Sequence, residues 1–216
     1  MKKLLLYLVV LFLFSACSFE TPPNEWQFKS INAFDSYQKN FLSSNDALAK
    51  NDLYRAIKHA KSSDDLTTLA RIYLGECALK ISVGVDDKCK DYEKISSLIK
   101  DETLNSYFLF ISKKSSDESL ISLAKNYQSF SRYLKEQNYK KANEALRDAQ
   151  EATSMFLCGA ILGKHADAAS VDKIIDAASL YGYKKVIIYW LGVKKDRTID
   201  PSEKEKITQK ISILGS

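Results

Sequence analysis

Apolar residues recur along most of this chain at the three-to-four-residue spacing of an α-helix. The clearest stretch lies between residues 31 and 41, and its apolar members are Ile31, Phe34, Tyr37 and Phe41. Similar stripes run through 53–60, 66–77 and 92–99, and the second of these ends near Gly84, a residue typical of helix C-terminal caps. Only seven Gly and three Pro occur in 216 residues, which leaves little material for the turns of an all-β protein. We therefore predict an all-α fold.

Two segments leave the choice between helix and strand open. Tyr107 to Ile111 and Val186 to Leu191 are apolar on all sides, and periodicity does not discriminate over so few residues. The β-branched residues of the second segment favour a strand. Elsewhere, Asn51-Asp52 interrupts the apolar spacing and predicts a tight turn between two helices.

Features of the first half recur in the second half, with offsets between 79 and 86 residues. Segment 48–56 resembles 134–142, segment 93–95 resembles 172–174, and 107–114 resembles 186–195. Two helix starts belong to the same series: Ser115-Ser116-Asp117-Glu118 has the form of a capping box, and Asp200-Pro201 offers a cap followed by a proline in the first turn. We expect about eleven helices in two similar halves, the last of them a capping helix.

Segments 48–60 and 134–146 resemble the turn and second helix of a tetratricopeptide unit. The matching residues are Asn51, Leu53, Ala56 and Ala60 in the first segment and Asn138, Tyr139, Ala142 and Leu146 in the second. The resemblance implies a tandem α-hairpin repeat array, or α-solenoid. The Trp-x-x-Leu-Gly start and the late Pro of that family are missing, so a generic α-hairpin array is the alternative.

The amino terminus has the organisation of an export signal. Lys2 and Lys3 precede eleven apolar residues, Leu4 to Phe14, a run that suits a secretory signal and is too short to span a bilayer. The following Ser15-Ala16-Cys17 resembles the lipobox of bacterial lipoproteins, although Phe14 stands where Leu is usual. The resemblance implies cleavage before Cys17, a lipid on its sulfur and an acylated amino terminus, for example with palmitate. The alternative is an ordinary secretory signal with Cys17 near its cleavage site by chance.

This interpretation divides the chain into a signal peptide (1–16), a lipidated tether (17–28) and a helical domain (29–216). Pro22-Pro23 makes the tether stiff. Trp26 and Phe28 either pack on the first helix or rest at the membrane interface, where aromatic rings are favoured. Ser18 follows the cysteine where enterobacterial lipoproteins retained at the inner membrane carry Asp, which favours the outer membrane.

Three cysteines remain after lipidation. An exported chain meets an oxidising compartment, so we predict a disulfide between Cys77 and Cys89, the pair closest in sequence. Cys158 lies in an apolar run and is expected to be a buried free thiol. The chain contains only two histidines, His59 and His165. The cysteines and histidines together do not have the spacing of a metal site, so we expect no metal and no cofactor.

The charge pattern and the absence of catalytic motifs favour a protein-binding function. Acidic and basic residues are interleaved at a net charge of +5, without the clustered basic face of a nucleic-acid-binding protein. No motif for nucleophilic, phosphate or metal chemistry occurs, so we expect no enzyme. Lipoproteins with tetratricopeptide-like units often serve as assembly factors. The resemblance therefore implies a lipid-anchored scaffold on the periplasmic side of the outer membrane that binds other envelope proteins. The alternatives are an envelope hydrolase with a polar pocket at His59 or His165, and a surface-displayed adhesin.

Overall fold

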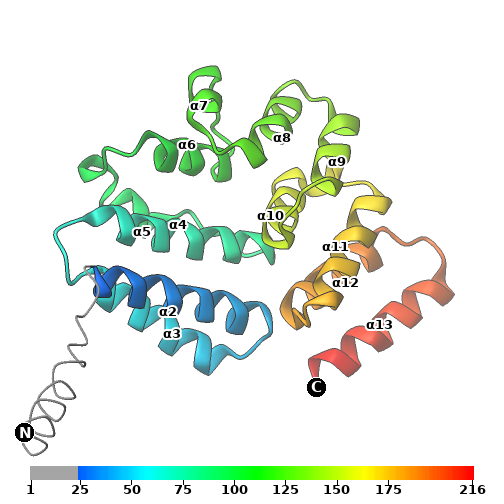
Figure 1. Ribbon diagram of the computed structural model, residues 1–216. Helices are drawn as coiled ribbons and strands as arrows, with labels where there is room; N and C mark the ends of the chain where they lie inside the picture. The colour runs from blue at the N-terminus through cyan, green and yellow to red at the C-terminus, as the bar shows by residue number, and fades with distance from the viewer. Residues whose placement is uncertain (1–23) are drawn as a thin grey trace, which may run out of the picture.

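The structure, a computed structural model, describes residues 24–216. That part of the chain contains twelve α-helices and no strand, which confirms the all-α prediction (Figure 1). The first six are α2 (Glu25–Leu42), α3 (Asp46–Ala60), α4 (Leu66–Ser82), α5 (Lys90–Glu93), α6 (Glu102–Ile111) and α7 (Asp117–Ser122). The remaining six are α8 (Lys125–Lys135), α9 (Tyr139–Arg147), α10 (Ala152–Leu162), α11 (Ala168–Leu180), α12 (Lys184–Arg197) and α13 (Pro201–Gly215). Two short 3₁₀ turns, Ser96–Leu98 and Gly163–His165, complete the described elements.

Both ambiguous segments are helical. Tyr107 to Ile111 lies in α6, and Val186 to Leu191 lies in α12. In α12 the buried Val186 and Trp190 sit four residues apart on one side of the helix, so tertiary packing overrides the strand preference of the β-branched residues. At the amino-terminal end, α2 already covers residues 25–28, which the sequence analysis assigned to the tether. Phe28 is 65% exposed there, so it does not pack into the core.

Three helical hairpins share one kind of turn. Residues 43–45 join α2 to α3, residues 136–138 join α8 to α9, and residues 181–183 join α11 to α12. In each turn the N–H of the middle residue bonds to a carbonyl three residues back, and the next N–H bonds to a carbonyl five residues back. This pattern is the Schellman motif, which requires a left-handed backbone at the middle residue. Those residues are Ser44, Gln137 and Gly182, with φ of 65°, 56° and 67°. The same kind of turn thus joins the two helices of three hairpins along the array.

The predicted turn at Asn51-Asp52 is wrong, because both residues lie inside α3. The carboxylate of Asp52 is mostly buried and accepts hydrogen bonds from Asn40 of α2 at 2.7 Å and from Arg55 at 2.8 Å. The carboxylate of Asp52 therefore makes a contact between α2 and α3, and the turn between these two helices lies at 43–45 instead. As a result, segment 48–56 is not the structural equivalent of 134–142, which does cross a turn.

The predicted capping residues are found at the helix starts, except that the capping box of α7 lies one residue later. At α7 the capping box is formed by Ser116 and Ser119, one residue later than expected and with a hydroxyl in place of the Glu118 carboxylate. At α13 Asp200 accepts from the N–H of Ser202 and Pro201 opens the helix, as predicted. The predicted glycine cap of α4 is also confirmed, since Gly84 has φ of 81° and its N–H bonds to the carbonyl of Ile81.

Helices α4 and α10 form the centre of the molecule (Figure 1). The first packs against α2, α3 and α6, the second packs against α8, α9 and α11, and the two pack against each other. Both are apolar on most sides, which is typical of helices that are covered all round. Gly159 permits the closest approach in α10, because a Cβ there would lie 2.5 Å from Ile174 and 2.8 Å from Trp190.

The last hairpin folds back onto the beginning of the domain. Helix α12 contacts α2, and its Lys185 forms an ion pair with Asp46 at the start of α3. Nearby, Tyr189 of α12 packs against Gly84, where any side chain would collide with the tyrosine ring. The array is therefore curled, and α13 is left at its outer end (Figure 1).

Candidate functional site

The predicted lipid-attachment residue, Cys17, lies outside the described residues, as does the signal that precedes it. No helix in the described range 24–216 has the length and apolar character that a bilayer span requires. Lipidation therefore stays a prediction.

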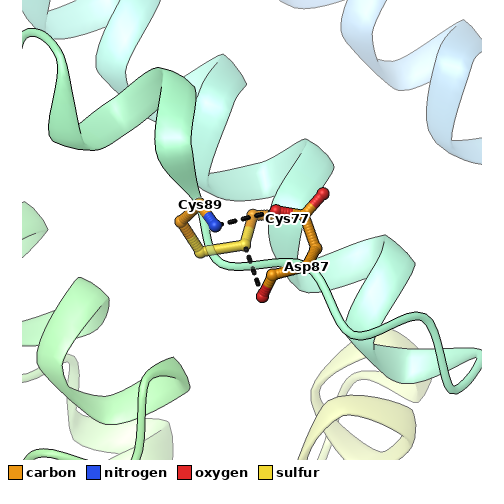
Figure 2. A group of neighbouring side chains, drawn as sticks. All are labelled: Cys77, Asp87 and Cys89. Carbon is orange, nitrogen blue, oxygen red and sulfur yellow. Dashed lines mark hydrogen bonds between the residues drawn. A yellow bond between two sulfur atoms is a disulfide. The ribbon is translucent and has the colours of Figure 1, made fainter.

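Cys77 and Cys89 form the predicted disulfide, with their Cα atoms 5.3 Å apart (Figure 2). It ties α4 to the loop that leads into α5. Asp87 lies beside it, and its carboxylate accepts from the N–H of Cys89 at 2.7 Å and pairs with Lys80 at 3.3 Å (Figure 2). Two cysteines and a carboxylate this close resemble a metal-ligand group. Because both sulfurs are bonded to each other, neither is a free thiolate, and the cluster is structural.

The charged side chains next to the disulfide form ion pairs with one another. Lys80 contacts Glu76 at 2.6 Å as well as Asp87. Burial disfavours its ammonium, but the hydrogen bond and charge of Glu76 and the charge of Asp87 outweigh this and raise the pKa of Lys80. The lysine therefore stays charged at neutral pH and does not act as a general base.

Cys158 is buried in α10 as a free thiol, as predicted. Burial raises the pKa of its thiol far above the ordinary value, so the thiol stays protonated at neutral pH. The ring of His165 stacks on Tyr139 with centroids 3.7 Å apart. His59 is half-buried on α3. Neither histidine lines the grooves described below.

The tyrosines do not gather into one concave binding face. Several of them are packed against the core, among them Tyr73, Tyr127, Tyr133 and Tyr139. Burial raises the pKa of Tyr127 to about 12, and its hydroxyl lies 2.9 Å from that of Ser154. Among the tyrosines of residues 24–216, Tyr54 and Tyr181 are largely exposed. Most tyrosines therefore fill the seams between helices, as aromatic stripes usually do.

An open surface with an apolar floor lies between the last three helices, and we name it the C-terminal groove. It has a volume of about 700 Å³. Its floor is apolar and comes from all three helices: Ile175 from α11, Leu191 from α12, and Ile207 and Ile213 from α13. A second depression, beside the loop 84–88, is smaller at about 480 Å³, and its lining exposes about as much polar as apolar surface, whereas the lining of the C-terminal groove exposes more apolar surface. The C-terminal groove thus offers more to an apolar ligand.

Charged residues border the C-terminal groove. Lys194 of α12 pairs with Asp172 of α11 at 2.8 Å and with Glu203 of α13 at 3.9 Å, so these three residues link the helices. The hydrogen bond from Lys194 to Asp172 raises the pKa of the lysine and outweighs the opposing effect of burial. Further along, Asp176 borders the groove on α11, and Lys206 and Lys210 border it on α13.

The groove is open because α13 is only lightly attached. Ile207 is the one fully buried residue of this helix, whereas Ile213 is 74% exposed. Contacts of α13 are mainly with α12. The sequence analysis expected a capping helix here and missed the groove. The available signal was Ile213, an isoleucine placed beside the stripe formed by Ile207, Ile211 and Leu214.

Comparison with known proteins gives no relative: no protein-family model, no curated protein and no solved structure matches the chain. The function therefore has to be argued from the residues and their arrangement.

Proposed function

We propose that this protein is a lipid-anchored scaffold on the periplasmic side of the outer membrane and that its C-terminal groove binds another envelope protein. The observation that carries the binding proposal is the exposed apolar floor of the groove, above all Ile213, between the last three described helices. Exposed apolar surface with a charged border is typical of protein-binding sites. The anchor part of the proposal rests on Ser15-Ala16-Cys17.

Binding accounts for the described side chains better than catalysis does. The protonated thiol of Cys158 and the stacked ring of His165 offer no activated nucleophile and base pair. A helical array with an end groove instead presents a shaped surface over several elements, as repeat proteins that bind proteins do.

In-cell photocrosslinking tests the proposal. A photoreactive amino acid is placed at Lys210, on the border of the groove, and for comparison at Lys50, an exposed residue of α3 that does not line the groove. Crosslinked species are identified by mass spectrometry. The proposal predicts that the probe at Lys210 captures an envelope protein that the probe at Lys50 does not.

Two variants connect the capture to the groove and to the anchor. Ile213→Asp puts a charge on the apolar floor, and its matched control is Ile199→Asp, at a residue that is 95% exposed and does not line the groove. Cys17→Ala removes the proposed lipid site. Loss of capture with Ile213→Asp and Cys17→Ala, but not with Ile199→Asp, supports the proposal. If no envelope protein is captured, or if Ile213→Asp does not reduce the capture, the proposed scaffold function is wrong.

A further inference from the structure

The way the array packs its own helices indicates what shape fits the C-terminal groove. Helix α4 lies against both helices of the hairpin α2–α3, and α10 lies against both helices of the hairpin α8–α9. Helix α13, in contrast, packs mainly on α12 of the last hairpin and stands apart from α11 (Figure 1). The groove between α11 and α13, with α12 beneath it, is therefore bounded by helices on three sides, and another helix is the element that such a surface accommodates.

The two borders of the groove carry opposite charge. Asp176 lies on the α11 side, and Lys206 and Lys210 lie on the α13 side. All three are exposed, and none of the ion pairs in the described part of the chain engages them. At the other end of the groove, by contrast, Asp172 and Glu203 already have a partner within the protein, because both pair with Lys194. The unpaired charges are thus available to a ligand.

We propose that the C-terminal groove binds an amphipathic α-helix of a partner protein, with the apolar stripe of that helix on the floor. Basic side chains on one flank of the bound helix face Asp176, and acidic side chains on the other flank face Lys206 and Lys210. This inference rests on the proposed function in one respect, namely that the groove is a binding site for protein. It adds the conformation and charge pattern of the segment that binds.

The opposite charges of the borders also set the direction of the bound helix. Turning an amphipathic helix end for end, with its stripe still on the floor, exchanges its two flanks. A helix with basic residues on one flank and acidic residues on the other therefore satisfies both borders in one direction only. Exchanging the flanks reverses the direction without changing the number of favourable pairs, so the test has to compare mixed flanks with uniform ones.

The experiment uses the full mature chain as the Cys17→Ala form and three synthetic helical peptides of about 14 residues, the length of α12. All carry the same leucine stripe, and their flanks are Lys and Glu, Lys and Lys, or Glu and Glu. Binding is measured by fluorescence anisotropy at low salt. We expect the mixed peptide to bind about three- to tenfold more tightly than either uniform peptide, as expected for a few partly exposed ion pairs. At 1 M salt, where charges are screened within about 3 Å, the difference disappears.

Charge reversal on the protein provides the sharper readout. In the double variant Lys206→Glu/Lys210→Glu both borders are acidic, so the peptide with two Lys flanks becomes the tightest binder. A merely structural effect of the substitutions does not produce this exchange of preference. Lys204→Glu, at an exposed residue of α13 that does not border the groove, keeps the preference of the unmodified protein. Ile213→Asp weakens all three peptides at least about tenfold, because it charges the floor that they share.

Equal binding of the three peptides, or no binding at concentrations up to about 1 mM, overturns the helix proposal. Such a result leaves the scaffold function standing if Ile213→Asp still abolishes capture in cells. Conversely, the expected peptide preferences without any capture in cells support the groove chemistry and contradict the scaffold function.

Discussion

The ammonium of Lys185 in α12 lies 4.2 Å from the centre of the Phe41 ring in α2. The same ammonium pairs with Asp46 at the start of α3. This contact joins the last hairpin of the array to the first, and it lies on the side of α12 that faces the beginning of the domain. A single lysine thus helps to determine that the array curls, and consequently where α13 and the groove are placed.

We expect Lys185→Met to lower the free energy of unfolding by about 1 kcal/mol, because the variant keeps most of the apolar stem but loses the cation over the ring and the ion pair. Urea unfolding followed by circular dichroism measures the change. Lys173→Met, at an exposed lysine of α11, serves as the control and should change stability little. An equal loss in both variants would show that the Phe41 contact contributes nothing specific.

The Schellman turns give a prediction of opposite sign at equivalent positions. Gln137 has φ of 56°, a conformation that costs a non-glycine residue about 1–2 kcal/mol, so Gln137→Gly should stabilise the protein by about 1 kcal/mol. Gly182 occupies the same place in the last hairpin with φ of 67°, and Gly182→Ala should destabilise by a similar amount although its Cβ meets no atom within 4 Å. Thermal unfolding of both variants checks the signs. Glu136→Gly, next to Gln137 but at φ of −72°, is expected to destabilise.

Two helical glycines should respond to alanine in opposite directions. Gly159→Ala would place a methyl 2.5 Å from Ile174 and 2.8 Å from Trp190, so we expect a loss of about 1–3 kcal/mol from overpacking. Gly192→Ala meets no atom within 4 Å and should gain up to about 1 kcal/mol from helix propensity. Denaturant unfolding of the two variants compares them directly. Stabilisation by Gly159→Ala would contradict the close packing of α10 against α11 and α12.

The number of reactive thiols tests the assigned state of each cysteine. In the Cys17→Ala form we expect no thiol to react with Ellman's reagent at pH 8 in the folded state, because Cys158 is buried and Cys77 is bonded to Cys89. Unfolding without reductant should expose one thiol, and unfolding with reductant should expose all three. The double variant Cys77→Ser/Cys89→Ser should lose about 3 kcal/mol of stability, as the chain-entropy model gives for a short loop.

Acid should weaken the start of α11. Partial burial favours the protonated carboxyl of Asp167, but hydrogen bonds from Ser170 and from Arg147 at 2.9 Å outweigh it and hold the pKa of Asp167 below the ordinary 3.8. Since the unfolded chain then binds this proton more readily than the folded chain, the stabilisation is present above about pH 3.8 and is lost as the pH falls through the lower folded pKa. Asp167→Asn keeps a capping side chain but does not titrate, so its stability should fall less between pH 5 and pH 2. Asp64→Asn, at an exposed carboxylate, should follow the unmodified protein.

Local chemistry could be predicted wherever a short stretch of sequence contains the whole cause. The glycine cap at Gly84, the proline start at Pro201 and the disulfide between neighbouring cysteines each depend on residues close together in the chain. The turn at Asn51-Asp52 could not be excluded in this way, because Asp52 is accommodated in a helix by Asn40, which belongs to another helix. The same reasoning applies to the Schellman turns at Ser44 and Gln137, where neither residue is the glycine that usually signals such a turn.

The sequence by itself determined that this protein is a helical array stapled by Cys77 and Cys89, because helical periodicity and cysteine spacing are local properties. Only the tertiary structure decided which apolar residues are covered. Ile207 and Ile213 are both isoleucines of α13, yet one is buried and the other is 74% exposed. The difference arises because α13 packs on α12 and stands apart from α11, and such an arrangement depends on contacts between helices that no periodicity within one helix records.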